Sequence, residues 1–117
     1  RKGHHYRHFH INKRSGGVRT ISAPRTFLKV VQWWILDTIL GQVDLPAEVH
    51  GFVRGRSFIT NAKAHLGASN ILNVDISNFF PSTKLGHVEI VFRSFGYSAS
   101  VSSCLAELST WDGCLPQ

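Results

Sequence analysis

The sequence is poor in acidic residues and cysteine and has no long apolar run. Its 117 residues contain 7 Asp+Glu against 13 Lys+Arg, so the formal net charge is +6 with histidine neutral. No apolar stretch reaches the roughly 18 residues that a membrane-spanning helix needs. No apolar segment of the signal-peptide kind follows the basic, histidine-rich start. We therefore expect a cytoplasmic protein with no membrane partner.

The two cysteines, Cys104 and Cys114, are too few for a disulfide framework, and their spacing is not that of a C-x-x-C motif. We interpret them as reduced thiols. The composition is otherwise typical of a folded chain, with 43% hydrophobic residues, three Trp and eight Phe. At this length one modest core is possible and two separate cores are not, so we expect a single domain at most.

The positive charge is concentrated at the start of the chain. Residues 1–29 contain eight basic residues and no acidic one, interleaved with Tyr6, Phe9 and Phe27. Such a distribution favours a polyanionic partner such as nucleic acid or a nucleotide. The alternative is a solvated basic face, and charge alone does not decide between the two.

Local patterns predict an α+β arrangement. Residues 6–11 alternate in polarity, a Gly-rich turn follows at 12–17, and residues 18–22 are suited to return as a second strand, which predicts a hairpin carrying Lys13 and Arg19. Helices are expected at about 27–40, with Gly41 as its cap, at 59–66 after Ser57, at 81–95, and at 98–110. A short, buried strand is expected at 70–75.

Asp75 is the most informative carboxylate because it ends this apolar stretch, where α/β folds tend to place reactive groups. The alternative is that Asp75 only caps a turn. Two other candidate motifs carry less weight. The glycines at 51 and 55 are too closely spaced for a phosphate-binding P-loop, which also needs a Lys before its Ser. The N-terminal histidines lack the companions of a closed zinc site.

In combination these features resemble the bacterial retron-type reverse transcriptases. Residues 6–32 are similar to the first conserved block of that family, and His50-Gly51-Phe52 with Gly55-Arg56-Ser57 to the second. The third block is matched by Asp75-Ile76 with Phe79-Phe80-Pro81-Ser82, and the opening of the fourth by Leu115-Pro116-Gln117. Asn61-Ala62-Lys63-Ala64-His65 is similar to the N-A-x-x-H signature of retron enzymes. The likeness covers nearly the whole chain.

The resemblance implies the fingers and the start of the palm of a right-hand polymerase, with fingers at about 1–68 and palm at about 69–117. It implies that Lys13 and Arg19 bind the triphosphate of an incoming nucleotide and that Gln117 lines the pocket near the 3′ hydroxyl. Phe80 falls at the family's steric gate, an aromatic ring that excludes a 2′ hydroxyl; its alternative is a core aromatic. The basic residues expected to bind nucleic acid are Arg14, Arg25, Arg54 and Arg56.

The resemblance also implies two Mg²⁺ ions, with the Asp75 carboxylate and the Ile76 carbonyl oxygen as ligands, since Mg²⁺ prefers hard oxygen donors. The family supplies its other carboxylates from a Tyr-x-Asp-Asp turn, which we expect after Gln117. Asp112, Asp37 and Asp44 are not credible substitutes. The 117 residues alone are therefore expected to be inactive.

The expected parent is an RNA-directed DNA polymerase that uses an RNA template, a DNA primer and deoxynucleoside triphosphates (dNTPs). Retron membership further implies a cognate non-coding RNA and a role in defence against phage, by family analogy. One alternative is a reverse transcriptase of the group II intron or abortive-infection type. Another is a non-catalytic RNA-binding module, which would show salt-dependent RNA binding without nucleotide or Mg²⁺ dependence.

Overall fold

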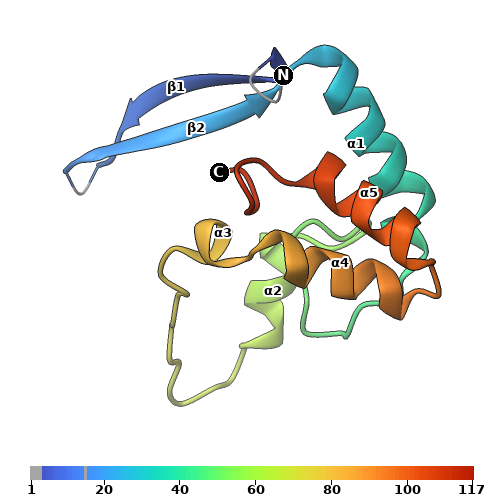
Figure 1. Ribbon diagram of the computed structural model, residues 1–117. Coiled ribbons are helices and arrows are strands. Elements are labelled where there is room, and N and C mark those ends of the chain that lie inside the picture. The colour runs from blue at the N-terminus through green and yellow to red at the C-terminus, as the bar shows by residue number, and fades with distance from the viewer. Residues whose placement is uncertain (1–3, 15) are drawn as a thin grey trace. The chain divides into compact units, whose positions relative to one another are not determined.

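A computed structural model describes residues 4–14 and 16–117 (Figure 1). Their contacts group into two compact units. We call Arg1–Gly41 with Ser77–Gln117 the hairpin unit, and Gln42–Ile76 the loop unit. Across the described part of the chain, no helix has the length and apolar character needed to cross a membrane.

The hairpin unit begins with the predicted β-hairpin. Strand β1 (Tyr6–Asn12) pairs antiparallel with β2 (Val18–Pro24), in a register that places Tyr6 opposite Pro24. Gly16 and Gly17 have φ of 87° and 86°, a left-handed conformation that glycine adopts without a steric penalty, and this explains the Gly-rich turn. The hairpin prediction is confirmed.

Three helices build the core of this unit. They are α1 (Thr26–Thr38), α4 (Leu85–Ser94) and α5 (Ala99–Ser109), and α5 packs against both of the others (Figure 1). The core cluster consists of Ile35, Ile39, Phe92 and Leu105. These side chains recur at helical spacing in the sequence, which is why the helices at 27–40 and 98–110 were predictable.

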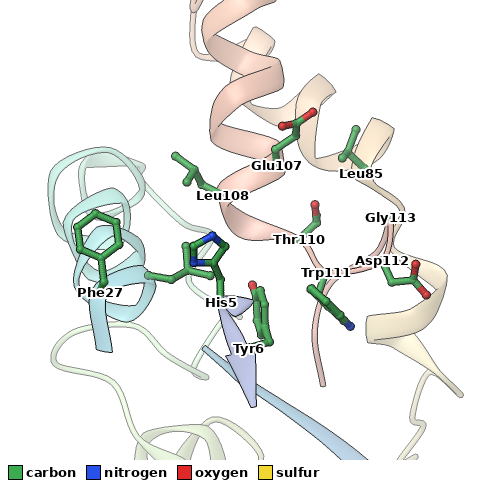
Figure 2. A pocket seen from close by; sticks show the side chains of 11 residues that line it. His5, Tyr6, Phe27, Leu85, Glu107, Leu108, Thr110, Trp111, Asp112 and Gly113 are labelled. Atoms are coloured by element: carbon green, nitrogen blue, oxygen red, sulfur yellow. The ribbon is translucent and has the colours of Figure 1, made fainter. Parts of the chain in front are cut away.

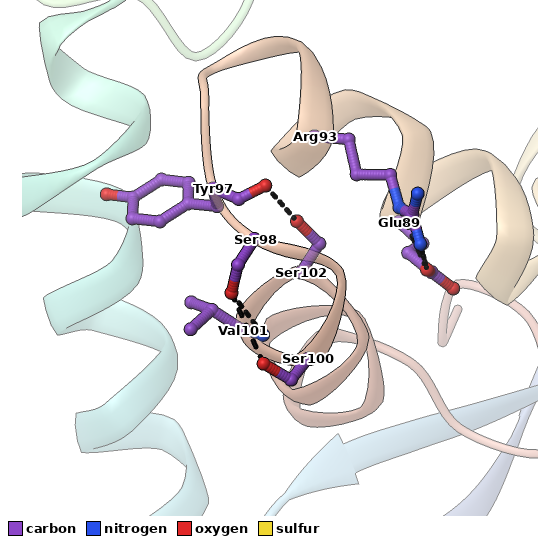
Figure 3. Close-up of polar contacts among 7 residues, drawn as sticks. All are labelled: Glu89, Arg93, Tyr97, Ser98, Ser100, Val101 and Ser102. Carbon is purple, nitrogen blue, oxygen red and sulfur yellow. Dashed lines mark hydrogen bonds and ion pairs between the residues drawn. The ribbon is translucent and has the colours of Figure 1, made fainter.

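Polar side chains form hydrogen bonds and an ion pair on α4 and α5 (Figure 3). The Ser98 hydroxyl accepts a hydrogen bond from the Val101 N–H and so caps α5. On α4, Glu89 and Arg93 form an ion pair at 3.1 Å, one helical turn apart. These local contacts fix the start of one helix and the exposed side of the other.

The predicted continuous helix at 81–95 is wrong. The structure instead has a short helix α3 (Phe79–Ser82), a break at Thr83 and Lys84, and then α4. The break is held by a distant segment: the Leu115 N–H donates to the Thr83 carbonyl at 2.9 Å, and the Leu85 N–H donates to the Gly113 carbonyl at 2.9 Å. Side-chain periodicity does not reveal such backbone pairing, so the pattern reads as one helix.

In the loop unit, α2 (Phe58–Ala64) starts at the predicted cap. Ser57 and Thr60 form a reciprocal capping box, in which each side chain accepts from the other residue's backbone N–H. A 3-10 helix, η2 (Leu40–Gln42), leads from the hairpin unit into the preceding loop. The short helix predicted at 59–66 is confirmed, with bounds shifted by one or two residues.

The predicted buried strand at 70–75 is wrong. Residues 68–76 form no strand, and Leu72 and Val74 are 86% and 79% exposed. A strand needs a hydrogen-bonding neighbour, and the two strands within the described residues pair only with each other. Asp75 therefore lies on an extended, exposed segment.

Candidate functional site

A cavity of about 290 Å³ opens in the hairpin unit beside the hairpin. Lys13 and Arg19 contribute from the hairpin, Pro81 from α3, and Gln117 from the end of the described chain. Three of the four residues predicted to bind a nucleotide therefore line one cavity. The fourth, Phe80, does not line it but is next to Pro81 in the chain.

A tight turn brings the last residues of the chain to this cavity. The backbones of Trp111 and Cys114 exchange two hydrogen bonds, of 2.8 and 3.1 Å, across Asp112 and Gly113. Both central residues have positive φ, 50° and 74°, which is the geometry of a type I′ turn, favoured by an Asp-Gly pair. The chain then runs back to β2, where the Ser22 N–H donates to the Gln117 carbonyl at 2.7 Å.

The basic groups at the cavity have no anionic partner in the described structure. Both Lys13 and Arg19 are exposed, and the only ion pair among residues 4–14 and 16–117 is Glu89–Arg93. An arginine guanidinium presents a planar fork that suits phosphate oxygens, and a lysine ammonium acts as a mobile point charge. This edge of the cavity is therefore suited to bind a phosphate group.

Trp111 also lines the cavity and was missed from the sequence. Its ring lies 5.0 Å from that of Tyr6 and 5.0 Å from that of His8, both tilted by about 40°. Nδ1 of His8 is hydrogen-bonded to the Ser22 hydroxyl at 3.0 Å. Trp111 is far from β1 in the sequence, so no local pattern indicates this packing.

The remaining predicted residues lie outside the cavity. Asp75 and Ile76 belong to the loop unit and are exposed. Phe80 is 42% exposed and packs edge-to-face on Phe79, with ring centres 5.6 Å apart, so it is not the core aromatic of the alternative interpretation. Their proposed roles stay predictions.

The four arginines predicted to bind nucleic acid differ in their surroundings. Arg14, Arg25 and Arg54 are exposed. The Arg56 guanidinium instead donates to the carbonyl oxygens of Leu45, Pro46 and Val49, the last at 2.6 Å. Arg56 thus holds the loop before α2 together, a role that the sequence did not indicate.

Asp75 and the Ile76 carbonyl offer oxygen donors, which is the ligand chemistry that Mg²⁺ prefers. Within the described residues, no three His, Cys, Asp or Glu side chains form a group that could hold a metal ion. The donor type fits Mg²⁺, whereas a two-metal centre needs carboxylates in addition to those described.

The structure defines an α+β protein in which two cations of the hairpin, Lys13 and Arg19, line a cavity together with Asp112. No family model matches the sequence. It is 41% identical over 106 residues to the retron Mx162 reverse transcriptase of Myxococcus xanthus, covering 91% of this chain and 22% of that protein. It is 39% identical to the retron Mx65 reverse transcriptase of the same organism, over 91% of this chain and 25% of that protein.

A further relative is the retron Ec86 reverse transcriptase of Escherichia coli, 39% identical over 86% of this chain and 31% of that protein. Over most of its length the chain is similar to retron-type reverse transcriptases, which confirms the resemblance seen in its motifs. It spans between about a fifth and a third of the length of these relatives.

Proposed function

We propose that the whole protein containing this sequence is an RNA-directed DNA polymerase, which adds deoxynucleotides to a primer 3′ end on an RNA template. Residues 1–68 contribute its fingers and residues 69–117 the start of its palm. The observation that carries the proposal is the meeting of Lys13, Arg19 and Gln117 at one cavity. Three relatives named as retron reverse transcriptases support it.

In this proposal the cavity holds the incoming nucleotide. Lys13 and Arg19 bind its triphosphate, because both are exposed cations without an anionic partner among the described residues. Gln117 lies against the sugar near the 3′ hydroxyl. The Ser22–Gln117 hydrogen bond fixes the Gln117 backbone beside the strand that carries Arg19, so the two side chains act on the same ligand.

Phe80 acts as the steric gate for the sugar. Its neighbour Pro81 lines the cavity, and its ring packs edge-to-face on that of Phe79. A ring held under the sugar excludes a 2′ hydroxyl by overlap and so favours deoxynucleotides.

Asp75 and the Ile76 carbonyl are the proposed Mg²⁺ ligands, completed by carboxylates of the Tyr-x-Asp-Asp turn expected after Gln117. When bound, the metal lowers the pKa of the primer hydroxyl and neutralises charge on the departing pyrophosphate. The contribution of this chain is the Asp75 carboxylate, which lies on an exposed, extended segment.

The proposed macromolecular partners are an RNA template, a DNA primer and a cognate non-coding RNA. Arg14, Arg25 and Arg54 are exposed and available for backbone phosphates. The retron names of the relatives favour a retron enzyme over the group II intron and abortive-infection types. By family analogy, the protein is cytoplasmic and serves in defence against phage.

Primer extension by the full-length protein on an RNA template, with dNTPs and Mg²⁺, tests the proposal. Asp75→Asn removes the carboxylate charge at nearly constant size and is expected to abolish synthesis. Asp37→Asn, at an exposed position on α1, is the matched control and should retain activity. A folded wild-type protein that binds RNA but synthesises no DNA would instead establish the non-catalytic binding module.

A further inference from the structure

A second cavity, of about 390 Å³, lies in the hairpin unit and has no part in the proposed reaction (Figure 2). Its volume is within the range of small-molecule sites. The start of β1 and the first turn of α1 form one side, and the end of α5 with the Asp112-Gly113 turn forms the other. Trp111 and Asp112 line both this cavity and the nucleotide cavity.

The floor of this second cavity is buried and mostly apolar. Tyr6 is 4% exposed and Leu28 7%. One amide nitrogen, Nε2 of Gln32, donates both to the Tyr6 hydroxyl at 3.0 Å and to the Leu108 carbonyl at 2.8 Å. This bridge joins β1, α1 and α5 under the cavity. The floor is therefore formed before any ligand arrives.

The walls are aromatic. Tyr6 and Trp111 pack at 5.0 Å with their ring planes inclined at 44°, and Phe27 lines the other side with 78% of its surface exposed. Figure 2 shows the Tyr6 and Trp111 rings next to each other below Thr110, with Phe27 beyond His5. Aromatic faces carry partial negative charge and attract organic cations.

The charge of this cavity's lining is opposite in sign to the net charge of the chain. In a chain with 13 Lys+Arg and 7 Asp+Glu, its lining contains two carboxylates, Glu107 and Asp112, and no Lys or Arg. Neither carboxylate takes part in an ion pair within the described residues. His5 is the other titratable group that faces the cavity besides Tyr6.

We propose that this cavity binds a small organic cation: an ammonium or guanidinium group on an aromatic or branched apolar body. The apolar body lies against Tyr6, Leu28 and Phe27, and the cationic group meets Glu107 and Asp112. A cationic group gains a charge-assisted contact with these carboxylates that a neutral ligand of the same shape cannot make, so the positive charge determines the selectivity. The two carboxylates would attract a cationic ligand group and repel an anionic one.

Isothermal titration calorimetry of the full-length protein with benzylamine tests this proposal, with benzyl alcohol as the neutral probe of the same size. Benzylamine is expected to bind in the millimolar range or tighter, and at least about tenfold more tightly than benzyl alcohol. The titration uses no nucleotide or template, so it does not depend on polymerase activity.

Two sets of variants, each with its own control, locate the binding. Glu107→Gln and Asp112→Asn should each weaken benzylamine binding by about tenfold, the factor for one lost charge-assisted contact, whereas Asp37→Asn should not. Asparagine tolerates the positive φ of residue 112, so the turn is retained. Phe27→Ala should weaken binding, whereas Val30→Ala, an exposed change on the same helix, should not.

Three results would overturn the proposal: no heat of binding with benzylamine, equal affinity for benzyl alcohol, or equal losses in the lining and control variants. Because the lining variants change exposed side chains, circular dichroism spectra matching the wild type exclude unfolding as the cause of any loss.

Discussion

The Ser22 backbone N–H donates to the Gln117 carbonyl at 2.7 Å, joining the second strand of the hairpin to the last residue of the chain. Together with the Leu115–Thr83 hydrogen bond, this contact places the end of the chain between β2 and the break after α3. The cavity lined by Lys13, Arg19 and Gln117 is a consequence of these two backbone contacts.

Removing the cations of the nucleotide cavity should weaken nucleotide use. Lys13→Ala and Arg19→Ala are each expected to raise the KM for dNTPs by about 10- to 100-fold, since a charge-assisted hydrogen bond contributes about 1.5–3 kcal/mol. Arg7→Ala, on the same hairpin but outside the cavity, is the control. Steady-state primer extension by the full-length protein measures the effect, and an equal KM in all three variants would argue against the cavity.

Substitutions of the neighbouring Phe80 and Phe79 should have different effects, because Phe80 is the proposed steric gate and Phe79 only packs against it. Phe80→Ala should allow ribonucleotides to be incorporated, because the ring that overlaps a 2′ hydroxyl is gone. Phe79→Ala removes the partner of the edge-to-face contact and should largely preserve the preference for dNTPs. Parallel primer extension with dNTPs and ribonucleoside triphosphates gives the selectivity ratio, and loss of selectivity in Phe79→Ala alone would reverse the assignment.

Gly113→Ala should destabilise the hairpin unit. Gly113 has a φ of 74°, and an alanine in this left-handed region costs about 1–2 kcal/mol. Gly86→Ala on α4, where φ is ordinary and a Cβ meets nothing within 4 Å, should instead be neutral or stabilise by up to about 1 kcal/mol. Urea denaturation midpoints compare the two changes, and similar shifts for both would contradict the role of the turn.

Substitution of Arg54 should affect RNA binding, whereas substitution of Arg56 should affect stability. Arg54→Ala is expected to weaken RNA binding and to reduce the slope of its salt dependence by about one, as for one lost phosphate contact. Arg56→Ala leaves three loop carbonyls without their donor and should mainly lower the stability of the loop unit. Filter binding at several salt concentrations measures the first effect, and amide hydrogen exchange in residues 45–49 measures the second.

Tyr6 should make stability fall in alkaline solution. Burial raises the pKa of the Tyr6 hydroxyl above its ordinary value of 10.0, and the hydrogen bond from Gln32 opposes part of this rise. Above pH 10 the unfolded chain loses this proton while the folded chain keeps it, so the free energy of unfolding decreases as the pH rises further. In Tyr6→Phe this contribution should be absent, which denaturation midpoints between pH 8 and 11 would reveal as a flatter profile.

Much of the local structure was predictable because it depends on neighbouring residues. Alternating polarity and a Gly-rich turn define the hairpin, apolar spacing defines α1 and α5, and Ser57 with Thr60 defines the start of α2. Lys13, Arg19 and Gln117 were identified through the family resemblance of their motifs, and the relatives confirm that family. None of these inferences needed a contact between distant residues.

Only the tertiary structure decided what depends on distant backbone groups. The stretch ending at Asp75 has the composition of a strand yet no neighbour to pair with among the described residues, and the helix pattern at 81–95 is broken where Leu115 pairs with Thr83. Three other features also depend on tertiary structure. The Trp111 ring packs on Tyr6, the Arg56 guanidinium binds three loop carbonyls, and the second cavity is lined by residues from separate segments. Side-chain pattern encodes local conformation, whereas backbone pairing and cavities exist only once the chain has folded, because each needs groups from separate segments to meet.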